Sequence, residues 1–442
     1  MTDRGPMDRL LANPSVGRLW DQDIVKVLAV FGAIYLGYVV IGMASGLTVQ
    51  GIFATLVQLT LLIAIYAMLS LSLNLHWGYT GLFNIGIVGF MAVGAYTMLL
   101  VSKPAASVSQ AALVGGFGLP FIVGAIAGTV AAALLGLVVA LPALRLKADY
   151  LAITTIAMAE IIRFTFLSAS FQEFQLFGRT VGTGGGRGLL VNFEDPITRY
   201  ILDTEWFASV AESVSAAMGI EGTIQPALET LVISVVLLGV VAGFYWVFSR
   251  TGSSPFGRVL KAIREDETVA RALGKNTDLF KIKSFMLGCG LMGLAGVFYA
   301  VFFLGSVNPT AFMPRFTFYI WIALIIGGAG SNTGSVLGAA LFVGVLFQGP
   351  LYLKNAIASV TEITDAPDTI AGGVAALGQL DLAPLFAYTL DNISNFRIIA
   401  LGLVLVWLMK RRQDGLLGHR KEHAASIPFD RRSGDAEEGT DR

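Results

Sequence analysis

The sequence predicts an all-α protein, a polytopic transmembrane helical bundle of about ten membrane segments. Hydrophobic residues make up 55% of the 442 residues, charged residues make up only 14%, and the mean hydropathy is +0.72. A soluble domain carries about 25% charged residues. The apolar residues also gather in long runs, which places the chain in the membrane class before any motif is considered.

A helix that crosses a bilayer needs about 20 apolar residues, because each residue adds about 1.5 Å along the axis. Two of the runs are short and flank the glycine-rich stretch Gly327–Gly334. Irregular backbone is tolerated at membrane depth only where protein or a cavity covers it, so we expect short broken or re-entrant helices there. The ten candidate segments run near residues 25–45, 51–75, 84–101, 119–142, 149–168, 228–249, 281–304, 316–328, 335–350 and 395–410.

Lysine and arginine gather in four places, and such loops stay in the cytoplasm. If the chain crosses the membrane ten times and its N-terminus is cytoplasmic, all four basic places lie in the cytoplasm. Nine crossings would place the basic C-terminal tail outside the cell. We therefore expect a cytoplasmic segment at 1–24, a transmembrane domain at 25–410 with a cytoplasmic loop at 250–280, and a cytoplasmic polar tail at 411–442. The long loops 195–225 and 351–394 then fall outside. The four places hold Arg4, Arg9 and Arg18; Arg145 and Lys147; Arg258, Lys261, Arg264, Arg271, Lys275 and Lys281; and Lys410, Arg411 and Arg412.

Several kinds of chemistry have no basis in the sequence. The formal net charge is zero, so no basic excess indicates a nucleic-acid partner. The phosphate-binding motif G-x-x-x-x-G-K-[ST] does not occur, and His76, His419 and His423 form no H-E-x-x-H pair. The single Cys289 allows neither an intrachain disulfide nor a structural zinc site. We expect no enzyme activity within the chain, no cofactor and no metal.

The basic loop contains a short amphipathic helix. Apolar residues at Val259, Ala262, Ile263, Ala270 and Leu273 suit one helix face, with charges around them. Glycine is the residue that most often ends a helix, which predicts a stop just after position 273. Such a helix either docks in the groove of a soluble partner or lies on the membrane surface, and the residues alone do not decide between these two.

The segment Gly257–Gly274 reads G-R-x-L-x-A-I-R-E-D-E-x-x-A-x-A-L-G. It resembles the coupling loop of branched-chain amino-acid ABC transporter permeases of the LivM type, a variant of the general ABC-importer E-A-A-x-x-x-G element. The chain has Thr268-Val269-Ala270 where the general element has Glu-Ala-Ala, and its glutamate stands one place earlier. The resemblance assigns ATPase coupling to Arg258, Ala262, Arg264, Glu265, Asp266, Glu267, Ala270, Leu273 and Gly274.

The stretch Leu73–Tyr96 is similar to a second signature of this family, N-L-x-x-G-x-x-G-x-x-x-x-G-x-x-x-F-x-x-x-G-A-Y. Glycines break a helix or let neighbouring helix backbones approach closely, and a polar asparagine at the start of a span needs a partner. The residues serve either packing and helix breaks or the translocation path. They are Gly78, Gly81, Asn84, Gly86, Phe90, Gly94 and Tyr96.

The stretch from Arg145 to Arg163 resembles a third family segment, R-x-x-x-D-Y-L-A-I…E-I-I-R. Glu160 and Arg163 are three residues apart, so they share a helix face and can pair. Ionisable groups at membrane depth face a bundle interior or a cavity. We expect an intramembrane ion pair, either structural or involved in gating. The loop Thr183–Leu189 also resembles the family's T-G-G-x-x-G-L loop and is either a binding-protein contact or a plain turn.

The resemblance spans residues 50–345 and implies the rest of a transport machine. It implies a multi-pass permease subunit in the plasma (inner) membrane of a prokaryote, with both termini cytoplasmic, surrounded by the lipid bilayer. The implied partners are a second homologous permease subunit, two ABC ATPase subunits and an extracytoplasmic substrate-binding protein. The expected substrates are leucine, isoleucine and valine, and the nearest alternative is urea or a short amide. An ion-coupled secondary transporter would need ionisable residues in 316–350, which has none. A channel or scaffold is the remaining class.

Overall fold

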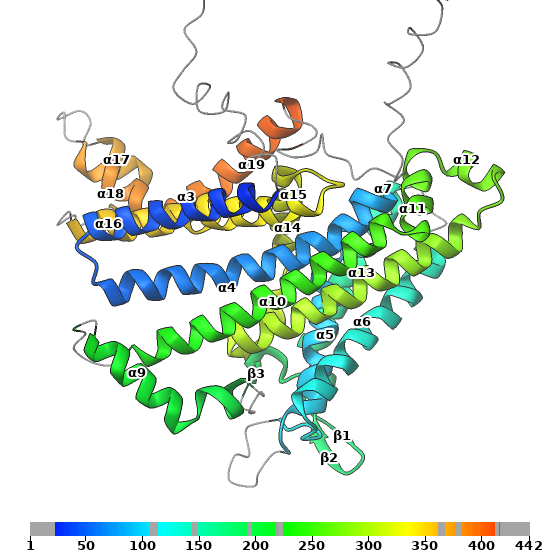
Figure 1. Cartoon of the computed structure of the whole chain (residues 1–442), viewed down its shortest axis with the longest axis horizontal. Coiled ribbons are helices and arrows are strands. Elements are labelled where there is room, and N and C mark those ends of the chain that lie inside the picture. Colours follow the sequence, from blue (N-terminus) through cyan, green and yellow to red (C-terminus); the bar gives the residue numbers. More distant parts are fainter. Residues whose placement is uncertain are drawn as a thin grey trace, which may run out of the picture.

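The computed structural model describes residues 23–105, 114–143, 148–191, 197–217, 219, 224–360, 367–375, 382–411 and 415. Its architecture is a bundle of long helices (Figure 1), so the predicted polytopic helical fold is confirmed. Several predictions fall outside the described residues: those for Arg4, Arg9, Arg18, Arg145, Lys147, Arg412, His419 and His423, and nearly all of the segments 1–24 and 411–442.

Seven of the described helical runs are long and apolar enough to cross a membrane, and the bent pair α18 and α19 raises the number to eight. α5 and α14 occupy two further predicted places but are shorter than a straight span requires. The helices that correspond to predicted segments are α3 (Asp23–Ala44), α4 (Val49–Asn74), α5 (Ile87–Ser102), α6 (Phe121–Ala143), α7 (Ala148–Leu167), α10 (Gln225–Ser253), α13 (Thr277–Tyr299), α14 (Pro314–Gly327), α15 (Asn332–Leu341) and α19 (Ile393–Arg411).

The ninth predicted segment is longer than expected. α15 continues through the π-helical turn η7 (Phe342–Phe347) into α16 (Gly349–Val360), and the run 332–358 is long enough to span a membrane. Pro350 does not end this run, because proline in the first turn of a helix removes only an N–H group that has no partner within the helix. The prediction of a short helix is therefore wrong here, whereas α14 is short, with 14 residues.

α4 forms the centre of the bundle. It contacts α3, α10, α13, α14 and α15, and every residue from Leu61 to Asn74 is buried. Figure 1 shows α10 and α13 running beside it. A helix surrounded in this way is apolar on every side, which explains why its sequence shows one continuous apolar run.

α5, α6 and α13 cross where glycines remove the side chains. A Cβ atom at Gly94 of α5 would lie 2.2 Å from the carbonyl oxygen of Gly293 in α13. A Cβ atom at Gly128 of α6 would lie 2.4 Å from the carbonyl oxygen of Gly94. Small residues allow helix backbones to approach closely inside membranes, and this crossing holds the three helices together.

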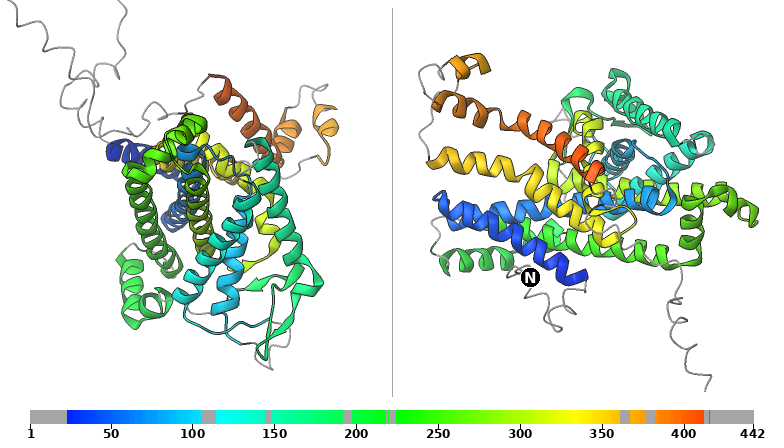
Figure 2. Two further views of the ribbon diagram at one scale, coloured as in Figure 1. Left: turned by 90° about the vertical axis from the view of Figure 1, so that its right-hand side faces the viewer. Right: turned by 90° about the horizontal axis from the view of Figure 1, so that it is seen from above.

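The long helices give the bundle two ends. The connection between α10 and α13 lies at one end and consists of α11 (Pro255–Glu265) and α12 (Glu267–Ala272). We call this the α11 end. The opposite end, the far end, carries α9 (Glu205–Ala217), α17 (Ile370–Ala375) and α18 (Ala383–Asp391) (Figure 1). Figure 2 shows α19 running beside α16 along the edge of the bundle, where Lys354 Nζ lies 3.2 Å from Asp391 Oδ1.

Two small strand pairs and several short turns complete the fold. β1 (Phe174–Leu176) pairs antiparallel with β2 (Arg179–Val181), and β3 (Leu189–Leu190) pairs antiparallel with β4 (Ser306–Val307). The β3–β4 ladder joins the chain after α7 to the chain after α13, and Val191 N donates to Gly305 O at 2.9 Å beside it. The short helical elements are η1 (Leu75–Tyr79), α8 (Ala169–Gln172), η3 (Gly185–Arg187), η4 (Thr198–Leu202), η5 (Ala300–Leu304) and η6 (Pro309–Phe312).

Candidate functional site

The predicted amphipathic helix is two helices. α11 begins at Pro255, and the hydroxyl of Ser254 caps it by accepting from Gly257 N at 3.2 Å. The chain leaves the helical conformation at Asp266, whose carboxylate accepts from Thr268 N at 2.8 Å and Val269 N at 3.1 Å. Asp266 is therefore the N-cap of α12, and it sets the angle between the two helices. Predicting a single helix across this residue was wrong.

The apolar residues of α11 and α12 divide between two faces. Leu260, Ile263 and Ala270 are buried against the bundle. Val269 is 54% exposed and Leu273 is 73% exposed, so α12 presents an apolar tip to its surroundings. Of the other predicted coupling residues, Arg258, Ala262 and Glu265 are also exposed. Gly274 has a φ of 78° and follows the end of α12, as a helix stop requires.

Glu267 fastens α12 to the start of α13. Its carboxylate oxygen Oε1 accepts from Lys281 Nζ at 2.8 Å, from Thr277 Oγ1 at 3.0 Å and from Arg271 Nη2 at 3.1 Å. Burial of the carboxyl favours its protonated form, but Lys281, Thr277 and Arg271 together outweigh that effect and lower the pKa of Glu267 below its ordinary value. The charged form is thus the one that holds α12 in place.

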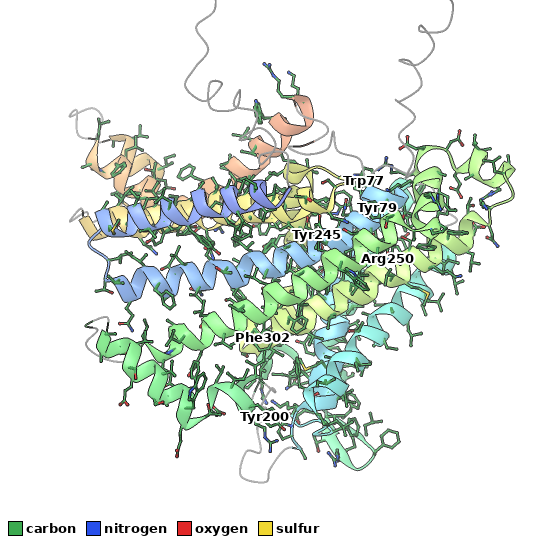
Figure 3. The ribbon with its side chains drawn as sticks, in the orientation of Figure 1. Trp77, Tyr79, Tyr200, Tyr245, Arg250 and Phe302 are labelled. Carbon is green, nitrogen blue, oxygen red and sulfur yellow. The ribbon has the colours of Figure 1, made fainter. Side chains whose placement is uncertain are left out.

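Arg264 connects α11 to η1, the π-helical turn that follows α4. Its guanidinium donates to the carbonyl oxygen of Gly78 and, at 2.6 Å, to Glu265 Oε1. A Cβ atom at Gly81 would lie 3.2 Å from Arg264 Cγ, and Lys261 Nζ lies 5.2 Å from the centroid of the Tyr79 ring. Figure 3 shows Trp77 and Tyr79 at the α11 end of α4. α11 therefore rests directly on the helix break.

The break consists of η1 and the non-helical residues 81–86, which lead to α5. Gly81 has a φ of 75°, a left-handed conformation that favours glycine. A Cβ atom at Gly78 would lie 2.5 Å from Gly330 N, and one at Gly86 would lie 2.5 Å from Thr155 O. Gly81 thus allows the turn of the chain, while Gly78 and Gly86 let the loop at Gly330 and the helix α7 at Thr155 approach the break closely.

Asn84 is buried inside this break and fully engaged. Its Oδ1 accepts from Gly86 N at 2.8 Å, and its Nδ2 lies 3.2 Å from Nδ1 of His76. The backbone carbonyl of Asn84 accepts from Nε1 of Trp321 at 3.0 Å. His76 Nε2 is in turn 3.1 Å from Phe285 O. These contacts hold the break in one conformation between α13 and α14.

The other residues of this signature lie in helix packing. The Phe90 ring is buried with its edge toward Phe285, 5.8 Å between centroids. Gly94 forms the crossing described above, and Tyr96 Oη donates to Val307 O at 3.4 Å. None of the three is among the residues that line the pocket beside the break, which is described below.

A polar clamp connects the two breaks of the bundle. Asn74 Oδ1 accepts from Gly330 N at 2.7 Å, and Asn74 Nδ2 donates to Asn332 Oδ1 at 3.1 Å. Asn332 Nδ2 donates to Ser249 Oγ at 3.2 Å on α10. The end of α4, the loop between α14 and α15, and the last turns of α10 are therefore fixed to one another. Sequence reasoning missed this clamp, although an asparagine within the longest apolar run was the available signal.

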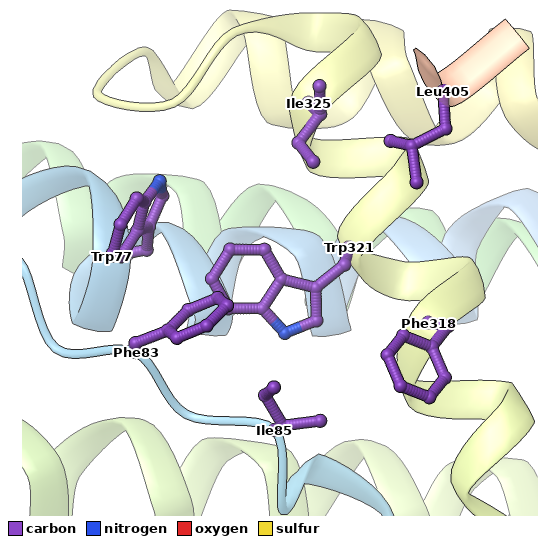
Figure 4. A pocket seen from close by; sticks show the side chains of 7 residues that line it. All are labelled: Trp77, Phe83, Ile85, Phe318, Trp321, Ile325 and Leu405. Carbon is purple, nitrogen blue, oxygen red and sulfur yellow. The ribbon is translucent and has the colours of Figure 1, made fainter. Parts of the chain in front are cut away.

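A pocket of about 500 Å³ opens beside the break. Its aromatic rings lie close together: the centroid of Trp321 is 4.7 Å from that of Phe83 and 5.5 Å from that of Trp77. Figure 4 shows these rings between η1, the break and α14. We call this the aromatic pocket. It is lined by Trp77, Phe83, Ile85, Phe318, Trp321, Ile325 and Leu405.

Glu160 and Arg163 pair on α7, apart from this pocket. Arg163 Nε donates to Glu160 Oε1 at 3.0 Å and Nη2 donates to Oε2 at 2.6 Å. The guanidinium also lies 4.3 Å from the centroid of the Phe164 ring. A gating role for the pair stays a prediction. In the loop Thr183–Leu189, the Thr183 hydroxyl donates to Phe166 O at 2.6 Å, so this loop is packed against α7.

A family model described as a branched-chain amino acid transport system permease component matches residues 55–365. The chain belongs to this permease family. The LivM high-affinity branched-chain amino acid transport permease of Escherichia coli K12 is 30% identical over 293 residues, 65% of this chain and 62% of that protein. The LivM protein of Methanocaldococcus jannaschii is 26% identical over 322 residues, 66% and 80% of the two chains.

A relative with a different name is similar to a shorter part of this chain. The LivH permease protein of Salmonella typhimurium is 30% identical over 149 residues, which is 33% of this chain and 42% of that protein. The chain spans a little over three fifths of the length of the E. coli relative. No solved structure matches it. Family membership and the apolar helices establish a multi-pass membrane protein.

Proposed function

We propose that the chain is the membrane-spanning permease subunit of an ATP-driven ABC importer for branched-chain amino acids. It lies in the plasma membrane of a prokaryote, with both termini and the α11 end in the cytoplasm. The observation that carries this proposal is the contact of Arg264 with the carbonyl of Gly78. That contact joins the predicted ATPase-coupling helices to the break whose aromatic residues wall a pocket.

The geometry suggests how force reaches the substrate. Movement of α11 pulls or releases η1 through Arg264, and η1 carries Trp77 on the wall of the aromatic pocket. The polar clamp passes the same movement to α15 and α10. A switch between two packed arrangements at this point alternates access to the two sides of the membrane. Solute crosses only when nucleotide binding drives that switch.

The exposed tip of α12 supports the docking of a partner. Val269 and Leu273 project from a surface otherwise rich in charge, and an amphipathic helix with exposed apolar anchors fits a groove on a soluble protein. We assign that groove to an ABC ATPase subunit, two of which serve the complex. A second homologous permease subunit and an extracytoplasmic substrate-binding protein complete the importer. Of the two alternatives for this helix, docking is therefore favoured over lying on the membrane.

The aromatic pocket favours an aliphatic substrate over urea or a short amide. All seven lining side chains are apolar or aromatic, and the Trp321 indole N–H is already bonded to Asn84 O. A polar solute such as urea would lose its hydrogen bonds to water there without replacement, which is costly. A branched aliphatic side chain gains from the same surroundings.

The test uses the assembled importer in proteoliposomes, with ATP hydrolysis and leucine uptake measured separately. Arg264→Glu removes a charge-assisted hydrogen bond, and such bonds contribute about 1.5–3 kcal/mol, which corresponds to about 10- to 100-fold in an equilibrium between two states. We expect the rate of leucine uptake to decrease by a factor of about 10 to 100, while ATP hydrolysis continues. Arg411→Glu, at the exposed end of α19, is the matched control and keeps normal uptake.

Two results would count against the proposal. Normal leucine uptake by the Arg264→Glu importer would show that α11 does not transmit force through the break. ATP-driven uptake of urea in preference to leucine by the unaltered importer would show that the substrate class is wrong.

A further inference from the structure

A second pocket, of about 400 Å³, lies between the first turns of α14 and α19. We call it the arginine pocket, because Arg315 and Arg397 both line it. α14 leads from there to the loop at Gly330, which lies beside Arg264. Arg315 and Gly327 are 12 residues apart, or about 18 Å along the helix, so this pocket lies toward the far end. Its aromatic wall consists of Tyr66, Tyr299, Phe303, Phe316, Tyr319 and Phe347.

Arg397 is held in place but not neutralised. Its guanidinium carbon lies 4.3 Å from the centroid of the Phe347 ring, and its Nη1 donates to Phe347 O at 2.7 Å. Its Nε is enclosed and has no hydrogen-bond partner among the described residues. Because Arg397 lines the pocket and, among the described residues, only its Nη1 donates a hydrogen bond, the guanidinium still has donor capacity for an anion.

Among the residues that the structure describes, the lining of the pocket contains no group that could neutralise its arginines. None of the described side chains that line it is acidic. Within the part of the chain that the structure describes, neither Arg315 nor Arg397 is in an ion pair. Ionisable residues inside membrane segments are costly and mark the paths of charged groups when they are kept. The missing negative charge is therefore expected to come from a bound molecule.

We propose that the arginine pocket receives an apolar amino acid, with the carboxylate on Arg397 and Arg315 and the aliphatic side chain against the aromatic wall. Guanidinium groups match a carboxylate with two parallel hydrogen bonds. This inference rests on the proposed function and adds which group of the substrate the permease binds. The phosphate of an anionic lipid headgroup carries the same kind of charge, and the experiment separates the two sources.

Both pockets are lined by α14 and α19, which favours a transported solute. On α14 they use different faces of the helix: Arg315, Phe316 and Tyr319 line the arginine pocket, whereas Phe318, Trp321 and Ile325 line the aromatic pocket, which extends further toward the α11 end. On α19, Ile398 lines the first pocket and Leu405 lines the second. The aromatic pocket therefore offers an apolar surface on another face of the same helix, further toward the α11 end.

The experiment measures how fast N-ethylmaleimide modifies a cysteine placed on the pocket wall, using the full chain in nanodiscs of zwitterionic phospholipid. Ser394→Cys places the thiol there, at an exposed position. Ser213→Cys, exposed on α9 and outside the pocket, is the control. The native Cys289 is buried and gives a low background.

We expect leucine at a saturating concentration to slow modification of Ser394→Cys about tenfold, as for about 90% occupancy, and leucinamide to change it less than about twofold. Arg397→Gln abolishes the slowing. Arg315→Gln does the same and serves as the second variant, because this side chain is exposed and its loss leaves the packing intact. Arg199→Gln, which lies outside the pocket, retains the slowing.

The proposal is overturned if leucine does not slow modification, or if leucinamide slows it equally. It is also overturned if phosphatidylglycerol in the nanodisc slows modification and leucine does not, since the pocket then holds a lipid headgroup. ATP-driven leucine uptake by the unaltered importer is measured in parallel. Uptake without protection refutes the site and leaves the proposed function standing, whereas absence of uptake refutes the proposed function itself.

Discussion

The crossing of α5 with α13 predicts a large effect from adding one methyl group. In Gly94→Ala the new Cβ atom would lie 2.2 Å from Gly293 O and 2.6 Å from both Gly293 C and Cα. An ordinary contact begins at 3.4 Å, so the two backbones must separate by about 1.2 Å, and neither contact is with a side chain that could rotate away. Overpacking of this kind costs about 1–3 kcal/mol.

The expected net change is a loss of about 2 kcal/mol. We take the upper part of the overpacking range because both partners are backbone, and subtract about 1 kcal/mol for the better helix propensity of alanine. Gly239→Ala in α10 is the matched control. A Cβ atom there meets nothing within 4 Å, so only the gain of about 0.5–1 kcal/mol remains.

The assay is reversible unfolding in mixed micelles with increasing sodium dodecyl sulfate, followed by circular dichroism. The two variants should differ by about 3 kcal/mol in free energy of unfolding, on the arithmetic of overpacking and propensity. An unfolding free energy for Gly94→Ala that equals or exceeds that of the unaltered chain would refute the close crossing, since no displacement of the helices would then be needed.

Two further predictions concern the clamp and the fastening of α12. Asn74→Ala leaves the buried N–H of Gly330 without its acceptor, and the same unfolding assay should show a loss of about 1–3 kcal/mol; an unchanged value would mean that the clamp is not formed. Because the pKa of Glu267 is lowered, its charged form stabilises α12 above the ordinary value of 4.5, and this contribution is lost as the pH falls through the folded value. A spin label at Leu273→Cys should become more mobile over that acidic range, and with Glu267→Gln it should be mobile already at neutral pH; equal mobility throughout would contradict the fastening.

The helices of the bundle were predictable because a membrane-spanning helix needs a long apolar run. Each of the ten predicted places contains a described helix. The spacing of Glu160 and Arg163 likewise defines their pairing, since contacts three residues apart depend only on helix geometry. The interruption between α11 and α12 at Asp266 was missed, because the apolar spacing on its two sides fits a single helix. Aspartate is nevertheless a common N-cap, which was the available signal.

The candidate site was less predictable, because its contacts join distant parts of the chain. Asn74 and Asn332 are 258 residues apart, and no local pattern indicates which buried asparagines meet. The aromatic pocket collects side chains from the break, α14 and α19, and the arginine pocket depends on how α19 packs beside α14. Propensity and periodicity describe single elements, whereas these sites arise only from how the elements are packed together.

The β3–β4 ladder has a consequence for how the far end can move. Main-chain bonds run from Leu189–Leu190 to Ser306–Val307, and Asn308 Nδ2 donates to Gly186 O at 2.8 Å beside them. The segments that follow α7 and α13 are therefore tied to each other by main-chain hydrogen bonds, and we expect them to move together under the proposed function. Spectroscopic probes placed on these two segments should keep a constant separation during transport, whereas probes on either side of the break at 81–86 should change theirs if the break is the pivot.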